Sequence, residues 1–292
     1  MIHRPAQVYR TPEEDSTRWH DFEFRPGDIV ISTGHKSGTT WTQMICALLV
    51  FQTPEPPAPL AELSPWLDHL VTPADEVYAL LDAQRHRRFI KTHTPLDGIP
   101  LDPGVTYVVV ARHPLDVAVS RYHWLDGVDQ EESATAVSQV GNGIIPPLRE
   151  WLLAWIGRND WQPDSLNRLF WHLSDAWTRR HEPNVALVHY DDLSTDLERE
   201  MRRLAALLGI TVADRLWPEL VRAATFGSMR SQADLLVPRT ASALKDSRTF
   251  FRQGRSGAGR ELLTDGEHLR YHERAADLAP PDLLSWLHRG TP

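Results

Sequence analysis

The sequence predicts an α/β fold in which a mostly parallel β-sheet carries helices on both faces, in a single domain of 292 residues. Three observations lead to this prediction. Short apolar runs typical of buried strands alternate along the chain with segments of helical periodicity. A loop of small residues at positions 34–40 joins the first of these runs to the first helical segment. No internal repeat and no linker with a shifted composition occurs, so one domain over residues 1–292 is the simplest division.

The strands of the sheet are expected where short apolar runs rich in valine and isoleucine occur. The four predicted strands are residues 28–33, 88–91, 106–111 and 185–189. Apolar residues at helical spacing predict the helices, at residues 40–51, 114–125, 148–156, 167–181, 197–208 and 265–278. Because strands and helices alternate, right-handed crossovers should connect parallel strands, and ligands should bind beyond the carboxyl ends of these strands.

Composition and charge exclude several classes of protein. The chain is 41% apolar and 24% charged, as folded proteins are, and its formal charge of −8 argues against broad nucleic-acid binding. The single cysteine, Cys46, lies in an apolar helical pattern, which indicates core packing in a reducing compartment. The N-terminus lacks a signal-peptide pattern, and the longest apolar run, residues 44–51, is too short for stable membrane insertion. We therefore expect a cytoplasmic protein.

The loop between the first strand and the first helix has the features of an anion site. It carries Lys36, Ser37, Gly38, Thr39 and Thr40. A loop of small residues at a helix start exposes backbone N–H groups at the positive end of the helix dipole, a geometry that binds phosphate. The lysine adds a full charge, and the hydroxyl groups add donors. The order differs from the Walker pattern, in which lysine directly follows the second glycine.

Two histidines directly follow predicted strands and should lie at the same edge of the sheet. His93 comes after the strand at 88–91, and Pro95 stops that strand from continuing. His113 comes after the strand at 106–111 and competes for the same role. An acceptor hydroxyl is a poor nucleophile near neutral pH and needs a base, for which histidine is suited.

Three motifs resemble those of the cytosolic-type sulfotransferase family. GHKSGTTW at residues 34–41 is similar to that family's loop YPKSGTTW, which holds the 5′-phosphosulfate of 3′-phosphoadenylyl sulfate (PAPS). RHPLDVAVSRY at 112–122 is similar to its 3′-phosphate motif, and FFRQGRSGAGR at 250–260 to FFRKGxxGDWK. The motifs also occur in the family's order. The resemblance implies a P-loop-like fold and transfer of the sulfuryl group of PAPS to an acceptor hydroxyl or amine.

The resemblance also implies roles for individual residues. Lys36 would stabilise the departing 5′-phosphate oxygen, and Lys91 would support the transferring sulfuryl group. His93, in the order KTH, matches the catalytic base and is favoured over the other candidate. Arg112 and Ser120 would bind the 3′-phosphate, and Ser120 would engage the loop lysine until the acceptor arrives. The expected adenine contacts are Trp41, Tyr190, Phe226 and Met229, and the residues expected to wrap the 3′-phosphate are Arg252, Gln253 and Gly254.

The sequence departs from the family pattern at several positions. Residues 34–35, Gly-His, replace Tyr-Pro, and Gln253 stands where lysine is usual, which removes one cation from the 3′-phosphate site. Residues 258–259, Ala-Gly, replace Asp-Trp. A dimerisation signature of the family's C-terminal region is not recognisable around Thr264, so the sequence leaves the oligomeric state open.

Two other classes of function remain possible on the same type of sheet. One is a nucleotide kinase, because Asp191 and Asp192 after the last predicted strand superficially resemble a magnesium-binding Walker B carboxylate. The other is a non-catalytic nucleotide-binding module. The inverted order of the loop lysine argues against the kinase, and the presence of Lys36, His93 and Ser120 together argues against lost catalysis. The motifs H-E-x-x-H and C-x-x-C are absent, so we expect no metal.

The sequence says less about the acceptor molecule than about the sulfuryl donor, PAPS. The segments RFIKTHTPLDGI and TDGEHLRYHERAADLAPPDLLSW look like actinobacterial sulfotransferases, including a mycobacterial glycolipid sulfotransferase, which implies a glycolipid or hydrophobic alcohol or phenol as acceptor. Residues 126–164 are expected to form a lid or insert over the acceptor, with a mobile polar part at 126–143. The residues expected to line a nonpolar acceptor pocket are Trp66, Trp124, Trp151, Trp155 and Trp161.

Overall fold

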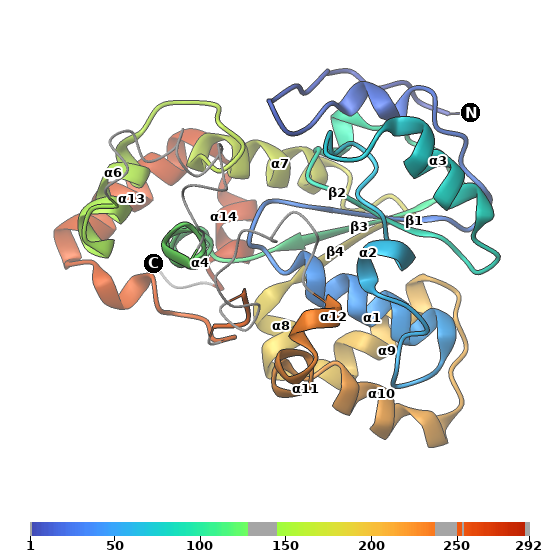
Figure 1. Cartoon of the computed structure of the whole chain (residues 1–292). Coiled ribbons are helices and arrows are strands. Elements are labelled where there is room, and N and C mark those ends of the chain that lie inside the picture. The colour runs from blue at the N-terminus through green and yellow to red at the C-terminus, as the bar shows by residue number, and fades with distance from the viewer. Residues whose placement is uncertain (1, 128–144, 237–249, 253, 290–292) are drawn as a thin grey trace.

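The computed structural model describes residues 2–127, 145–236, 250–252 and 254–289. At its centre is a sheet of four parallel strands in the order β2-β1-β3-β4 (Figure 1). Its strands are β1 (Ile29–Thr33), β2 (Phe89–Thr92), β3 (Thr106–Ala111) and β4 (Val185–His189). The predicted parallel sheet is therefore confirmed, with each strand within one residue of its predicted bounds.

Alternate residues along the strands pack into two separate cores, one on each face of the sheet. In β1, Ile29 and Ile31 join one core, whereas Val30 joins the other. All three side chains are fully buried. Both faces of the sheet are covered, and this explains why the strands are almost continuously apolar.

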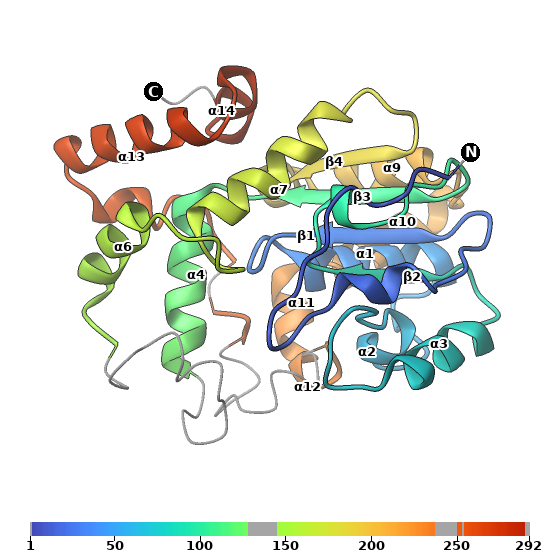
Figure 2. The same cartoon turned by 90° about the horizontal axis from the view of Figure 1, so that it is seen from above.

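Helices cover both faces of the sheet, as the alternation of elements predicts (Figures 1 and 2). The helices of the first core are α1 (Thr39–Phe51), α2 (Leu60–Leu63), α8 (Tyr190–Thr195), α9 (Leu197–Leu207), α10 (Trp217–Ala223), α11 (Phe226–Ser231) and α12 (Ala233–Leu236). Those of the second core are α3 (Ala74–Ala83), α4 (Pro114–Gly127), α6 (Leu148–Gly157), α7 (Leu166–Thr178), α13 (Asp265–Leu278) and α14 (Pro281–Leu287). Short 3-10 turns lie at Ser16–Trp19, Leu96–Gly98, Asp214–Leu216 and Arg260–Leu262.

The six predicted helices are all present, but several others were not predicted from the sequence. α7 ends at Thr178, three residues before the predicted end at residue 181, and a turn precedes Pro183. The helices α3, α8, α10, α11 and α14 are six to ten residues long, too short for a clear periodic pattern. The predicted mobile part of the lid lies mostly outside the described residues, so the lid and the single-domain division remain predictions.

A buried ion pair joins the amino-terminal ends of β1 and β2. The guanidinium of Arg88 donates to both carboxylate oxygens of Asp28, at 2.9 and 2.5 Å, and both side chains are almost fully buried. The same guanidinium lies over the ring of Phe22, 4.8 Å from its centroid. A bidentate pair of this kind satisfies both charges in a low-dielectric environment. It therefore holds β1 and β2 together at their amino-terminal ends, the end of the sheet away from the cavity.

The structure was also searched for helices that could cross a membrane. Among the described residues, none is both long enough and apolar enough to do so.

Candidate active site

The loop after β1 has the backbone geometry of an anion-binding turn. Lys36 and Gly38 both adopt positive φ angles, 61° and 111°, and Gly38 is the N-cap residue of α1. A Cβ at Gly38 would make a tight contact of 3.1 Å with the ring of Tyr190, and residues with a side chain rarely adopt this φ. The hydroxyl of Ser37 is buried and has no hydrogen-bond partner among the described residues. A left-handed residue in a helix-starting turn points successive N–H groups into one concavity, which suits an anion.

A large cavity of about 610 Å³ opens beside this loop, at the carboxyl ends of the strands. It brings together most of the residues that the sequence singled out. The predicted site residues that line it are Lys36, Gly38, Thr39, Thr40, Trp41, Lys91, His93, Arg112, Ser120, Tyr190, Phe226 and Met229. Ser37, Arg252 and Gly254 do not line the cavity, and Gln253 lies outside the described residues. Residues distant in sequence therefore meet at one edge of the sheet, as parallel topology requires.

Lys36 sits among other cations at the floor of the cavity. Burial and, after it, the nearby charges of Arg121 and Arg112 together lower the pKa of its ammonium to about 7. The ammonium also lies 4.4 Å from the centroid of the Phe250 ring. A lysine in such surroundings gains strongly from an anionic ligand, because the anion supplies the missing counter-charge.

Arg112 links the loop to the third sequence motif. Its guanidinium donates to the backbone carbonyl of Lys36 and to that of Arg255, both at 3.2 Å, and it stacks over the Tyr190 ring at 4.2 Å. The buried Nε atom has no hydrogen-bond partner among the described residues. Backbone carbonyls hold the guanidinium without neutralising it, so its positive charge remains available for a phosphate.

His93 presents an unprotonated nitrogen. Its Nδ1 lies 2.7 Å from the backbone carbonyl of Thr33, which can only accept, so Nδ1 carries the proton and Nε2 is free to take one. Burial lowers the pKa of this imidazole well below its usual value, and the nearby rings and charges of His35 and Lys91 lower it further. Only 8% of the residue is exposed. The geometry is that of a general base that is neutral before the reaction.

Lys91 lies on the same side of the cavity as His93. Its ammonium is 3.7 Å from the centroid of the Trp66 ring, which also meets His93 edge-on with the ring centroids 4.7 Å apart. Burial lowers the pKa of Lys91 to about 8, opposed by the negative charges of Glu14 and Asp68. This second buried cation is placed next to the base, where charge on a transferring group would develop.

An aromatic wall closes the other end of the cavity. Trp41 and Tyr190 meet edge-on with centroids 5.2 Å apart, and the indole N–H donates to the carbonyl of Ala224. Gly254, at φ 62°, lies against the ring of Phe226, which a Cβ would approach to 2.4 Å. The third motif therefore borders the aromatic wall, which suits a planar base.

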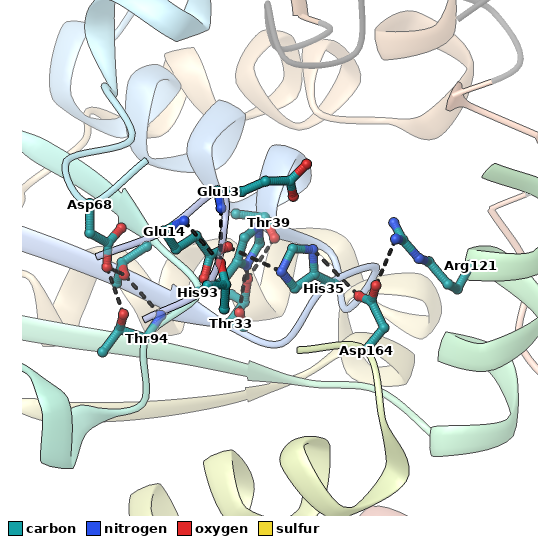
Figure 3. A network of polar contacts seen from close by, with 12 residues as sticks. Glu13, Glu14, Thr33, His35, Thr39, Asp68, His93, Thr94, Arg121 and Asp164 are labelled. Atoms are coloured by element: carbon teal, nitrogen blue, oxygen red, sulfur yellow. Dashed lines mark hydrogen bonds and ion pairs between the residues drawn. The ribbon is translucent and has the colours of Figure 1, made fainter. Parts of the chain in front are cut away.

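A polar cluster that the sequence did not reveal lies on the acceptor side of His93 (Figure 3). The ring of His35 stacks on that of His93, with centroids 4.0 Å apart and an angle of 27° between planes. Its Nε2 lies 3.3 Å from Glu14 and its Nδ1 3.7 Å from Asp164, whose carboxylate pairs with Arg121 at 2.6 Å. These groups come from distant parts of the chain, and the only sequence signal was the departure from Tyr-Pro at residues 34–35.

The competing candidates lie elsewhere. His113 is buried against Tyr271 and His288 and does not line the cavity. Asp191 accepts a hydrogen bond from Ser256, and Asp192 pairs with Arg289 at 2.5 Å. Among the described residues, no group of three or more histidine, cysteine, aspartate or glutamate side chains is arranged to hold a metal ion. The geometry thus favours His93 over His113 as the base.

The predicted acceptor tryptophans are distributed over two neighbouring cavities. Trp66 and Trp124 line the large one, and Trp155 and Trp161 line a smaller one of about 140 Å³ that also contacts His35 and His93. The fifth, Trp151, lines neither and packs beside Trp124 and Leu125. Four of the five predicted positions therefore border space next to the base.

The fold and the site define an enzyme that moves an anionic group from a nucleotide to an acceptor. A model of the sulfotransferase domain matches residues 26–277, so the chain belongs to this family, as predicted from the motifs. Glycolipid sulfotransferases of Mycobacterium bovis and Mycobacterium tuberculosis are 42% identical to the chain over 311 and 310 residues, which covers 97% of the chain and 94% of each relative. Canine sulfotransferase 1A1 is 25% identical over 260 residues, 86% of the chain and 83% of that protein.

Solved structures share the fold at lower sequence identity. A mouse sulfotransferase in complex with PAP superposes with a TM-score of 0.71 at 19% identity, covering 99% of both chains. A retinol dehydratase in complex with androsterone and PAP gives 0.66 at 21% identity, over 91% of this chain and 86% of that one. Together with the family match, these likenesses confirm the predicted sulfotransferase fold.

Proposed function

We propose that the chain transfers the sulfuryl group of PAPS to a hydroxyl group of a glycolipid or of another hydrophobic alcohol. The observation that carries this proposal is the position of His93. Its unprotonated Nε2 belongs to the same cavity as the anion-binding loop and its lysine. A base beside an anion site suits sulfuryl transfer to a hydroxyl.

We infer that the cavity receives the two phosphate groups of PAPS. The loop from Lys36 to Thr40 would receive the 5′-phosphosulfate, since its turn at the start of α1, with Lys36 and Gly38 at positive φ, presents backbone N–H donors. Arg112 and Ser120 would receive the 3′-phosphate, since the guanidinium keeps an unpartnered Nε. The adenine would lie on the wall formed by Trp41, Tyr190, Phe226 and Met229.

The chemistry follows from these positions. A bond forms between the acceptor oxygen and sulfur while the bond from sulfur to the 5′-phosphate oxygen breaks, and His93 Nε2 takes the acceptor proton. Lys36 and Lys91 stabilise the negative charge on the leaving phosphate and on the transferring group. Both lysines are buried, which lowers their pKa values to about 7 and about 8, so they respond strongly to added negative charge.

The acceptor side supports an amphiphilic alcohol. Trp66 and Trp124 provide apolar surface, while Glu14, Arg121 and Asp164 provide charged groups for hydroxyls. The names of the mycobacterial relatives, which are 42% identical, point to glycolipids as the acceptor class. The cytoplasmic location predicted from the sequence remains a prediction.

The test is a screen of glycolipids and simple alcohols with ³⁵S-labelled PAPS. We expect at least one hydroxyl acceptor to gain label, and the variant His93→Asn to lose roughly 10²–10⁴-fold in turnover, the usual contribution of a general base. PAP should still raise the melting temperature of that variant, because the base does not hold the nucleotide. Equal protection by ATP, or wild-type turnover in His93→Asn, would contradict the proposal.

A further inference from the structure

A buried carboxylate binds the two residues that flank His93 at the end of β2 (Figure 3). Asp68, in the segment between α2 and α3, is fully buried, and its Oδ2 accepts from the hydroxyl of Thr92 at 2.5 Å and from that of Thr94 at 2.6 Å. The indole N–H of Trp19 donates to the same oxygen at 2.9 Å. A buried carboxylate requires such donors, and two of the three belong to the neighbours of the candidate base.

The direction of these hydrogen bonds follows from the other partners of each group. An indole N–H can only donate. The hydroxyl of Thr92 accepts the backbone N–H of Thr94 at 2.9 Å, so its own hydrogen is directed to the carboxylate. The backbone carbonyl of Thr94 in turn accepts from the hydroxyl of Ser32 in β1, at 2.7 Å. Residues 92–94 are therefore held through both threonine hydroxyls and through the last carbonyl.

The two threonines fix the direction of the side chain between them. Because both bind one oxygen, they face the same side, and the imidazole of His93 points instead to the carbonyl of Thr33, 2.7 Å from its Nδ1. We propose that Asp68 is a positioning residue that holds the flanking threonines and thereby fixes the imidazole of His93. With Nδ1 kept on that carbonyl, Nε2 keeps its lone pair for the acceptor proton. This inference rests on the proposed role of His93 as base.

The segment that carries Asp68 runs along the end of β2 and is itself fixed there. The backbone N–H of Lys91 donates to the carbonyl of Pro65 at 3.0 Å, and that of Leu67 donates to the carbonyl of Lys91 at 3.3 Å. Burial and, after it, the charge of Glu14 raise the pKa of Asp68 to about 6, against the three hydrogen bonds that it accepts. The carboxylate is therefore mainly ionised at pH 7.5, where its role is tested.

The experiment records long-range ¹H–¹⁵N spectra of the full chain labelled with ¹⁵N-histidine, at pH 7.5 and without cosubstrate or acceptor. The signals of His93 are assigned by their loss in His93→Asn, and they show which ring nitrogen carries the proton. We expect a proton on Nδ1 alone in the wild type. Asp68→Ala removes the shared acceptor, and Thr94→Val removes one donor while keeping the shape of its side chain. Both variants should show an additional form of His93 with the proton on Nε2.

Two control variants separate positioning from stability. Thr94→Ser keeps the hydroxyl and should give the wild-type spectrum. Trp19→Phe removes the third donor to the same oxygen and destabilises the core but leaves both threonines in place, so it should also give the wild-type spectrum. A wild-type spectrum in Thr94→Val would overturn the proposal, even if Asp68→Ala does not fold. An Nε2-protonated form in Trp19→Phe or Thr94→Ser would also overturn it, because the change would then not depend on the threonine hydroxyl.

Turnover gives a second measurement on the same variants. With ³⁵S-labelled PAPS, Thr94→Val should lose roughly 10- to 100-fold in turnover, since a displacement of about 1 Å can cost about 100-fold. PAP should raise its melting temperature as in the wild type. The spectra involve no sulfuryl transfer, so the two proposals can fail separately. An Nε2-protonated form in Thr94→Val together with wild-type turnover would support the role of Asp68 and contradict His93 as the base.

Discussion

Binding of PAP should take up a proton at Lys36, and this coupling can be measured. The pKa of Lys36 is lowered to about 7 in the free protein, first by burial and then by Arg121 and Arg112. Two phosphates in the cavity would raise that pKa, because they supply opposite charge. The part of the PAP affinity that depends on a charged Lys36 is therefore fully present below about pH 7. It is lost as the pH rises above that value.

The magnitude follows from the pKa alone. At pH 8 only about one molecule in ten carries a charged Lys36, so binding should take up about 0.9 protons at this group. Between pH 7 and pH 9 the affinity linked to Lys36 should fall by roughly 50-fold, or about 2.3 kcal/mol. Above pH 7 the phosphates of PAP are mainly dianionic and contribute little to this slope.

Isothermal titration calorimetry at pH 8, in two buffers of different ionisation enthalpy, measures the proton uptake directly. Lys36→Met should bind PAP more weakly at pH 7 and should lose the 50-fold component of the pH dependence. Lys91→Met serves for comparison: it keeps Lys36, so much of the pH dependence should persist, although the pKa of Lys36 should rise because Lys91 is one of the charges that lower it. If the wild type and Lys36→Met have the same pH dependence, Lys36 does not meet the anion as reasoned.

Two further substitutions test the second anion site and the sheet. Arg112→Gln removes a charge-assisted hydrogen bond of about 1.5–3 kcal/mol, so PAP should bind roughly 10- to 150-fold more weakly. Binding of 5′-AMP, which has no 3′-phosphate, should change little, and an equal loss for both ligands would show that this arginine does not select the 3′-phosphate. Arg88→Met leaves the buried Asp28 carboxylate without its counter-charge and should cost about 3–5 kcal/mol in urea unfolding. Part of that loss should return in the double variant with Asp28→Asn, and a single variant as stable as the wild type would refute the argument.

The sheet and the phosphate loop could be predicted from the sequence because their signals are local. Apolar runs mark the strands, and parallel topology then places the residues after β1, β2 and β3 at one edge. α1 begins one residue earlier than predicted, at Thr39, because the positive φ of Gly38 already forms its N-cap. The long periodic helices were found for the same reason, whereas the short helices gave no periodic signal.

The acceptor side could not be predicted because its contacts are distant in sequence. Glu14 lies in the N-terminal segment, His35 in the loop, and Asp164 between α6 and α7, and no local pattern connects the three. The sequence also could not separate His93 from His113 by position alone, since both follow strands. Only the packing of His113 against the C-terminal helices removes it from the cavity.

The ring of Tyr190 has a consequence for how this enzyme can change over evolutionary time. The ring would be in tight contact with a Cβ at Gly38, and it supports the guanidinium of Arg112 on its face. Any larger residue at position 38 would strain the backbone and press against this ring. We therefore expect substitutions at Gly38, Arg112 and Tyr190 to affect one another, and these three positions to change more slowly in evolution than those on the acceptor side.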